Sequence, residues 1–216
     1  VEVETVPWRR DVRIDDCSIG VLDALETARS GDRLYFCARQ LLTEAGEAEE
    51  EEGTVARFQW EGMAVAKGEL FIMGDESACL LGRWLLHSRS RGVFQGVSCA
   101  YKLEEGSVLQ HATLTSYTAH WVIADCEVRC AGSTAILLLE EADFEVESSN
   151  IGGVGTDAED LALNVISALQ LSSVSLRSCR LEDSGDVAAR PPRNSKGVID
   201  LAGGWSVVGG GGAGVL

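Results

Sequence analysis

Short runs in which apolar and polar residues alternate dominate the chain from residue 54 onward. Gly, Ser and Asp turns separate these runs, and the first five are Val55–Trp60, Glu69–Met73, Cys79–Leu86, Val93–Ala100 and Val108–Thr115. A period of two turns one set of side chains inward and the other outward on a β-strand. No sustained helical pattern follows position 30. The pattern therefore predicts an all-β body.

One helix is predicted ahead of this body, in Ser18–Ala28, with Ser18 as its N-cap. Its apolar residues recur at helical spacing: Ile19, Leu22, Leu25 and Ala28. The turn Ser30–Asp32 ends the helix, and Arg33–Cys37 has the composition of a strand. The residues before Ser18 predict no clear element.

An internal repeat is the most informative feature of the second half of the chain. Trp121–Val128 (WVIADCEV) and Leu139–Val146 (LEEADFEV) superimpose at an offset of 18 residues. Leu169–Leu176 (LQLSSVSL) follows the second copy at an offset of 30, and Ile199–Val207 (IDLAGGWSV) is a fourth copy. This alignment predicts two internal ladders, one of Cys126, Phe144 and Val174 and the other of Val128, Val146 and Leu176.

Repeats of this length without helices cannot bury their apolar faces alone and must stack on one another. The leucine-rich pattern and a six-residue period are absent, and propeller blades need about 40 residues. We therefore expect a right-handed parallel β-helix of about six or seven coils, roughly 30 Å long, with the helix capping its first coil. The expected organisation is an N-terminal extension at 1–17, one β-helix domain at 18–208 with an acidic insertion at 44–53, and a Gly-rich tail or further coil at 209–216.

Composition narrows the function classes. The 216 residues include 34 acidic and 18 basic ones, a formal net charge of −16, which argues against nucleic acid as a partner. No apolar run is long enough to span a membrane. The chain begins without Met, which indicates a processed chain or a fragment.

The chain has seven cysteines, and an odd number spread through apolar strands suggests buried thiols in a reducing, intracellular setting. Cys126 and Cys130 are the closest pair, yet on a strand they would lie about 13 Å apart. No metal site, disulfide or cofactor is therefore expected.

Several segments resemble pectin-lyase-like β-helix domains. Ser18–Phe36 resembles the opening of that fold, a short helix followed by Ala-x-x-Gly-Asp and a strand, and Glu69–Gly74 resembles its next coil. Trp121–Gly153, continued by Cys179–Gly185, is similar to the non-catalytic β-helix domains of F-box and SHC-binding-type eukaryotic proteins. The resemblance implies a β-helix without an active site.

Candidate catalytic residues are few. The hydrolase motifs Gly-His-Gly and Arg-Ile-Lys are missing, and only Gly155–Asp157 and Asp15–Asp16 offer partial acidic motifs. In the predicted stacking, Asp125 and Asp143 lie on adjacent coils near Arg129, where they could bind calcium or a sugar. Two carboxylates on an exposed ladder more often form solvated surface.

The remaining candidates are histidines and tryptophans. His87, His111 and His120 lie in no motif and are expected to be structural or exposed. The five tryptophans could line a sugar-binding groove, but the repeat register favours core packing for them. They are Trp8, Trp60, Trp84, Trp121 and Trp205.

The sequence thus predicts a non-catalytic scaffold subunit, not an enzyme, whose partners are other protein subunits of a larger assembly. The alternative is a carbohydrate-active protein that binds or cleaves polysaccharide, with Asp125, Asp143 and Arg129 as its site. A groove with three or more carboxylates would favour the alternative.

Overall fold

The computed structural model describes residues 9–15, 20–37, 55–75, 78–102, 112–131, 134–154, 166–168, 171–182, 198–202 and 206–208. The acidic insertion, Gly155–Asp157, Asp16, Cys17, His111, Trp8 and Trp205 lie outside the described residues.

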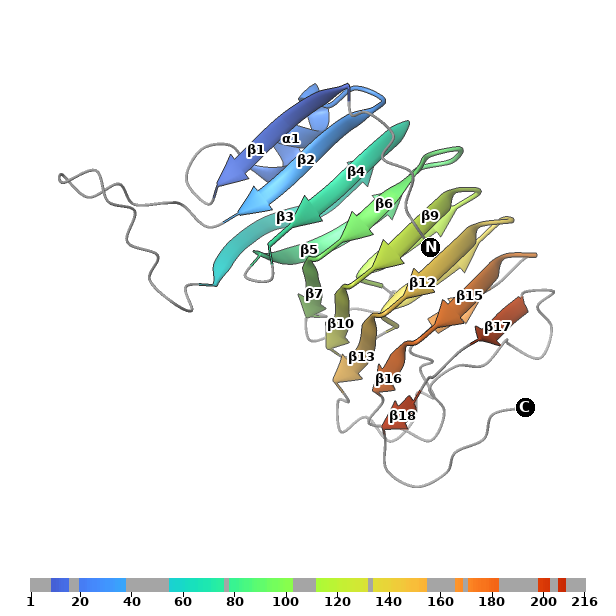
Figure 1. The fold of residues 1–216 in the computed structure, drawn as a ribbon. Coiled ribbons are helices and arrows are strands. Elements are labelled where there is room, and N and C mark those ends of the chain that lie inside the picture. The colour runs from blue at the N-terminus through green and yellow to red at the C-terminus, as the bar shows by residue number, and fades with distance from the viewer. Residues whose placement is uncertain are drawn as a thin grey trace.

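Two parallel sheets wind around one core (Figure 1). The eight-stranded sheet, called the front sheet, is ordered β1 (Arg10–Asp15), β2 (Asp32–Cys37), β4 (Glu69–Gly74), β6 (Arg91–Gln95), β9 (His120–Ala124), β12 (Asp143–Glu147), β15 (Ser173–Arg177) and β17 (Val198–Ala202). The ten-stranded sheet, called the side sheet, contains β3 (Ala56–Ala66), β5 (Ala78–Leu86), β7 (Ser98–Lys102), β8 (Leu114–Tyr117), β10 (Glu127–Ala131), β11 (Ile136–Leu139), β13 (Asn150–Val154), β14 (Ile166–Ala168), β16 (Arg180–Glu182) and β18 (Ser206–Val208).

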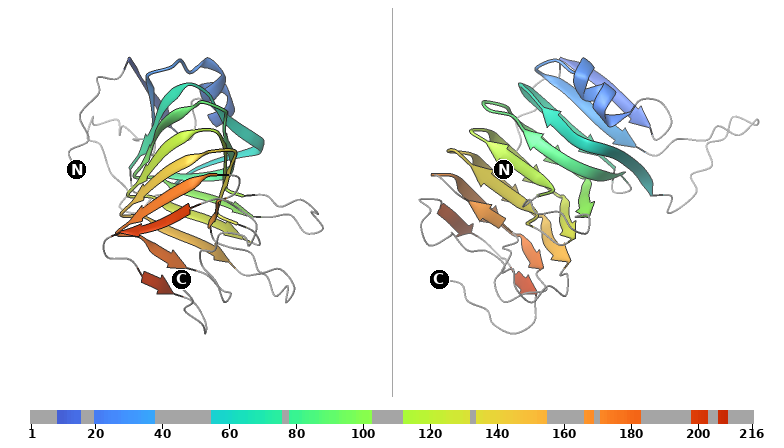
Figure 2. Two further views of the ribbon diagram at one scale, coloured as in Figure 1. Left: turned by 90° about the vertical axis from the view of Figure 1, so that its right-hand side faces the viewer. Right: turned by 180° about the vertical axis from the view of Figure 1, so that it is seen from behind.

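Each coil crosses the front sheet once and then the side sheet, on two successive faces. The long strand β5 shows this division, since Cys79–Leu81 pairs with β7 and Trp84–Leu86 pairs with β8. Later coils use separate strands for the two faces, such as β10 and β11. The coils stack along one axis (Figure 2). The fold is thus the predicted all-β solenoid, a parallel β-helix.

The predicted register of the repeat is wrong in the first pair of copies. Phe144 pairs with Trp121, 23 residues earlier along the chain, and not with Cys126. Both Trp121–Ile123 and Cys126–Val128 alternate with the same period, but the first lies in the front sheet and the second at the start of the side sheet. Sequence alternation alone could not distinguish them. The pairing of Phe144 with Val174, at an offset of 30, is confirmed.

The fourth copy is also shifted. Val174 pairs with Ile199 in β17, 25 residues later. Val207, the last residue of the fourth copy, pairs with Leu181 in the side sheet and not with Leu176, the last residue of the third copy.

Aromatic side chains form a continuous contact chain through the core. Ring centroids lie 5.3 Å apart for Trp60 and Trp84, 5.2 Å for Trp84 and Phe94, and 5.2 Å for Phe94 and Trp121. Trp84 and Trp121 are fully buried, and the Nε1–H of Trp121 donates to Ser90 Oγ at 3.0 Å. These tryptophans therefore pack in the core, as the sequence indicates, and do not line a sugar groove.

A column of left-handed backbone conformations makes the turn from the front sheet to the side sheet. Gly96, Asp125, Ser148 and Ser178 all have φ between 50° and 65°. Each of the first three donates its backbone N–H to the carbonyl of the next coil: Gly96 to Ala124 at 3.2 Å, Asp125 to Glu147 at 3.1 Å and Ser148 to Arg177 at 3.0 Å. The first position requires glycine, because a Cβ there would lie 2.8 Å from the carbonyl oxygen of Gly74.

The N-terminal end differs from the prediction in two ways. The helix α1 (Val21–Thr27) begins at Val21 with Gly20 at its N-cap and no side-chain capping bond, so Ser18 is not the cap. In addition, β1 pairs with β2 and forms the end strand of the front sheet, where no element was expected. The helix packs against β3 and β1 and buries Val21 and Ala24 in the core. No described helix is long and apolar enough to cross a membrane.

Candidate functional site

A row of polar side chains runs along the outer face of the front sheet, one from each of five neighbouring strands. Its members are the first residues of β4, β6, β9, β12 and β15, in register with one another. We call Glu69, Arg91, His120, Asp143 and Ser173 the charged row. The next residue in each of these strands turns inward, so alternation leaves the row on the surface.

Hydrogen bonds and ion pairs order the charged row. Arg91 Nη2 lies 3.1 Å from Glu69 Oε2, and His120 Nδ1 lies 3.0 Å from Asp143 Oδ2. Ser173 Oγ donates to the other oxygen, Asp143 Oδ1. The side chains of Arg91, His120 and Asp143 remain 66 %, 52 % and 50 % exposed, so a ligand can reach them.

The contact with Asp143 fixes how His120 can act. When Nδ1–H donates to the carboxylate, the lone pair of the ring is on Nε2. Among the described residues, no protein group bonds that Nε2 atom. A base oriented by a carboxylate, in register with Arg91 of the neighbouring strand, is an arrangement that can remove a proton from a bound anion.

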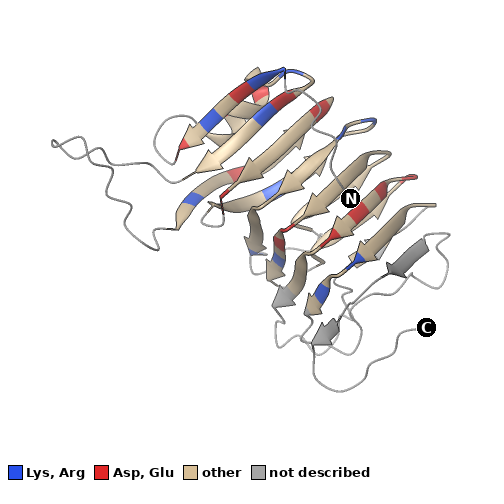
Figure 3. Ribbon diagram, viewed as in Figure 1, with Lys and Arg blue, Asp and Glu red and all other residues tan. Residues whose placement is uncertain are grey.

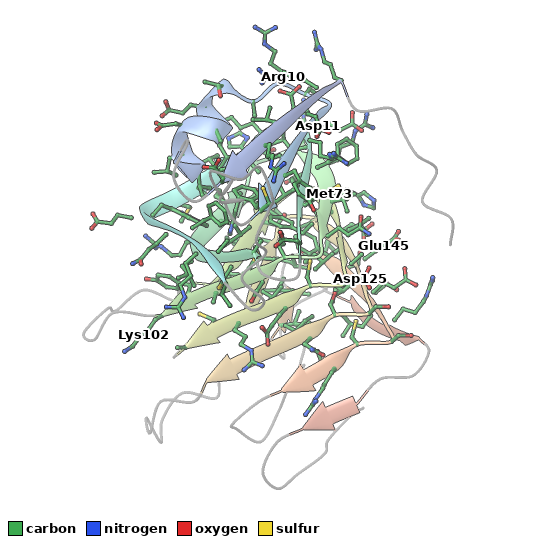
Figure 4. The ribbon with its side chains drawn as sticks, turned by 60° about the vertical axis from the view of Figure 1, so that its left-hand side comes forward. Arg10, Asp11, Met73, Lys102, Asp125 and Glu145 are labelled. Atoms are coloured by element: carbon green, nitrogen blue, oxygen red, sulfur yellow. The ribbon has the colours of Figure 1, made fainter. Side chains whose placement is uncertain are left out.

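A second row of outward-facing side chains lies two residues further along the same strands. In the strands that contribute Glu69, Arg91 and His120 to the charged row, this second row is apolar. It consists of Phe71, Val93 and Val122, each partly exposed. Beyond Val122 the same row continues with Glu145, which is exposed and is labelled in Figure 4. A partly exposed apolar strip beside ordered polar groups suits the carbon–hydrogen faces of a sugar ring.

Of the residues proposed from the sequence, only Asp143 belongs to this row. Asp125 lies in the turn after β9, roughly 13 Å or more along the strand direction from the row. Arg129 lies in the side sheet on β10, where its Nη2 is 2.6 Å from Glu127 Oε1. The predicted site of Asp125, Asp143 and Arg129 is therefore wrong, because it depended on the incorrect offset of 18.

His120 is the member of the charged row whose contact with Asp143 the sequence did not predict. It was expected to be structural or merely exposed, because no motif surrounds it. The true offset of 23 residues brings it against Asp143. His87, in contrast, is exposed at the turn after β5. Only the coil lengths could have revealed the His–Asp pair, and these vary along the chain.

Carboxylates do not gather into a metal site in the described part of the chain. Asp143, Glu145 and Glu147 all face outward from β12, but successive ones are about 7 Å apart along the strand. Glu147 lies 3.9 Å from Arg177 Nη1. Within the described ranges, no group of three His, Cys, Asp or Glu side chains is placed to hold a metal ion. The six cysteines described form no disulfide with one another, and Cys126 and Cys130 are buried.

Comparison with known proteins identifies the fold. No family model and no curated protein matches the sequence. Among solved structures, a mutant of the PL6 family alginate lyase AlyGC is similar over 91 % of this chain and 28 % of that chain, with a TM-score of 0.50 and 9 % identity. The pectate lyase Pel9A is similar over 98 % of this chain and 80 % of that chain, with a TM-score of 0.34 and 7 % identity. At 9 % identity the likeness to the alginate lyase shows the fold alone, a parallel β-helix.

The alginate lyase corrects the expected function. That protein is a polysaccharide-cleaving enzyme built on the same fold, so the finding speaks against the predicted non-catalytic scaffold and favours the carbohydrate-active alternative, which is argued below as a proposal. The prediction that the chain is not an enzyme rested largely on missing hydrolase motifs. A lyase breaks its bond by elimination, and it does not need the paired carboxylates of a hydrolase.

Proposed function

We propose that this chain is a carbohydrate-active β-helix that binds an acidic polysaccharide on its front sheet and cleaves it by β-elimination. The observation that supports this most directly is the His120–Asp143 pair, exposed beside Arg91. The chain corresponds to 28 % of the alginate lyase's length, so the activity of any larger protein belongs to the same proposal.

In the proposed reaction, the guanidinium of Arg91 pairs with the carboxylate of a uronate residue. This pairing acidifies the adjacent C5–H bond and stabilises the negative charge that develops during proton removal. Nε2 of His120 takes the C5 proton. The electrons of the C5–H bond form the C4=C5 double bond while the C4–O4 bond breaks. The imidazolium then returns the proton to the departing oxygen, so the enzyme ends unchanged.

Asp143 and Ser173 are positioning residues in this scheme. The carboxylate of Asp143 holds the ring of His120 and stabilises its cation, while Ser173 Oγ holds the carboxylate. Glu69 keeps Arg91 near the row by their 3.1 Å contact. The apolar strip of Phe71, Val93 and Val122 supports the sugar rings.

The finer likeness to F-box and SHC-binding-type domains stays a prediction from sequence.

The test is an elimination assay with alginate, polygalacturonate and chondroitin as substrates. Cleavage creates a double bond conjugated to the carboxylate, which is followed by ultraviolet absorbance. We expect His120→Ala to lower the rate by about 100-fold or more, the contribution typical of a general base. His87→Ala removes another exposed imidazole and should leave the rate unchanged. An inactive chain, or a His120→Ala variant as fast as the parent, would overturn the proposal.

A further inference from the structure

Charges of opposite sign are separated along the corner that leads into the front sheet. This entry corner is the position two residues before the charged row in each coil. From β4 to β15 it is occupied by Lys67, Arg89, Thr118, Glu141 and Leu171. Backbone atoms connect the corner of neighbouring coils: Arg89 N donates to Thr118 O at 2.8 Å, and Thr118 donates from its N–H to Leu139 O at 3.2 Å and from its Oγ1 to Glu140 O at 2.7 Å.

The basic side of the corner is open to a ligand. Lys67 and Arg89 are exposed, and among the described residues neither side chain makes an ion pair. Together with Arg91 they place three cations on the coils of β4 and β6, opposed there by Glu69, which is already paired with Arg91. A chain with a net charge of −16 therefore presents a local basic patch.

The acidic side begins two strands later. Glu140 and Glu141 are exposed in the turn into β12, and Asp143 follows them in the charged row. Figure 3 shows this separation, with the loop into β6 blue and the loop into β12 red. The coil of β9 lies between the two sides and contributes Thr118 and His120, at the position where the proposed cleavage occurs.

The distance between the two sides is large enough for neighbouring sugars to meet different charges. Adjacent strands are about 4.8 Å apart, so β6 and β12 are separated by roughly 10 Å. That is comparable with the screening length in physiological salt, about 8 Å. One coil also rises by about the length of one sugar residue in an extended chain. A uronate on β6 would thus be attracted, while a second carboxylate near β12 would be repelled.

We infer that the substrate is a heteropolysaccharide in which a uronate is followed by a neutral or amino sugar. The uronate lies against Lys67, Arg89 and Arg91, and the sugar without a carboxylate lies against Glu140, Glu141 and Asp143. This inference rests on the proposed function and specifies its substrate class. The acidic side disfavours the binding of uronate homopolymers. Such a polymer would place one of its own carboxylates beside the carboxylates of Glu140, Glu141 and Asp143, and the like charges would repel.

The test compares chondroitin, which alternates glucuronate with an N-acetylated amino sugar, with polygalacturonate, a uronate homopolymer. Initial elimination rates are measured at low and at high salt. We expect chondroitin to be cleaved about tenfold faster at low salt, with a smaller ratio at high salt because the repulsion is screened. The double variant Glu140→Gln, Glu141→Gln should raise the rate on polygalacturonate severalfold relative to the rate on chondroitin. Glu61→Gln, an exposed change on β3, is the matched control.

The outcomes separate the two proposals. Polygalacturonate cleaved as fast as chondroitin, in a reaction that still requires His120, would overturn the inference and leave the proposed function intact. A double variant with the parent's substrate preference would also overturn the inference. If no polymer is cleaved by the parent chain, the proposed function fails, and the inference fails with it.

Discussion

His120 and Asp143 are joined across two neighbouring coils of the front sheet, with Nδ1 of the histidine 3.0 Å from Oδ2 of the aspartate. The two residues are 23 positions apart in the chain and become neighbours because β9 and β12 pair in parallel. Both side chains are about half exposed, so the pair contributes little to stability. Its geometry instead suits a base whose orientation is set by a carboxylate.

Replacing Asp143 by Asn should impair elimination without preventing substrate binding. The amide can donate a hydrogen bond to the ring, which would favour the tautomer whose lone pair is on Nδ1 and leave Nε2 protonated. We expect kcat to fall by about 100-fold while KM changes little, as expected when an interaction acts chiefly in the transition state. Steady-state kinetics with the best polymer of the panel measures this.

The matched control for this variant is Glu145→Gln. Glu145 faces outward from the same strand, two residues further on, and is exposed on the same side of the sheet. A general loss of negative charge on β12 would affect both variants alike. Equal loss of kcat in the two would contradict the role assigned to Asp143.

The core requires glycine at position 92. A Cβ added there would lie 2.0 Å from the carbonyl oxygen of Leu70 and 2.8 Å from the ring of Trp121. The first of these is backbone, which cannot move aside, so Gly92→Ala should lower the free energy of unfolding by about 1–3 kcal/mol or more. Urea unfolding followed by Trp fluorescence measures the change. Ala100→Gly, at an outward position of the side sheet, is a comparison that should cost about 1 kcal/mol or less.

Sequence patterns were sufficient for the fold because each strand alternates clearly. Trp121, Ile123, Phe144 and Val146 are all buried, as period-two alternation requires. The site could not be predicted in the same way, because it depends on which residues of different coils become neighbours. Coil lengths differ, with 23 residues from His120 to Asp143 and 30 from Asp143 to Ser173. The turns absorb these differences without leaving a sequence signature, so a shift of five residues placed Asp125 and Arg129 in the wrong site.

The N-terminal strand shows the same limitation. The segment before residue 18 mixes apolar and charged residues without a clear pattern, yet β1 joins the front sheet, where Arg10 pairs with the buried Asp32 of β2. An ion pair between distant residues is not visible as a periodic pattern.

The Asp32 carboxylate should make stability depend on pH in the acid range. Burial by itself would raise its pKa, but the hydrogen bonds from Arg10 and from the backbone N–H of Arg29 outweigh burial and hold the pKa below its ordinary range. A lowered pKa in the folded state means that the ionised group stabilises the fold above the pKa of the unfolded chain. That stabilisation is lost as the pH falls through the folded-state pKa.

Unfolding in urea at pH 7, 5 and 3 tests this prediction. Asp32→Asn should cost about 1–3 kcal/mol at pH 7, the value of hydrogen bonds to a charged group. The difference between the variant and the parent should shrink towards pH 3. A difference that stays constant with pH would show that Asp32 acts through its shape rather than its charge.

Cys126 should be unreactive in the folded protein. Its side chain is 4 % exposed, and burial raises the pKa of the thiol to about 12. At pH 8 the thiolate fraction is then about one in ten thousand, and the thiolate is the form that alkylating reagents attack. Iodoacetamide should therefore label Cys79, which is partly exposed, before Cys126.

Peptide mass spectrometry after timed alkylation measures the order of labelling. Addition of urea above the unfolding midpoint should bring Cys126 to the rate of an ordinary thiol, because the burial that raises its pKa is lost. Rapid labelling of Cys126 in the native protein would mean that the turn between β9 and β10 opens far more often than its hydrogen bonds to Glu147 and Ser149 imply.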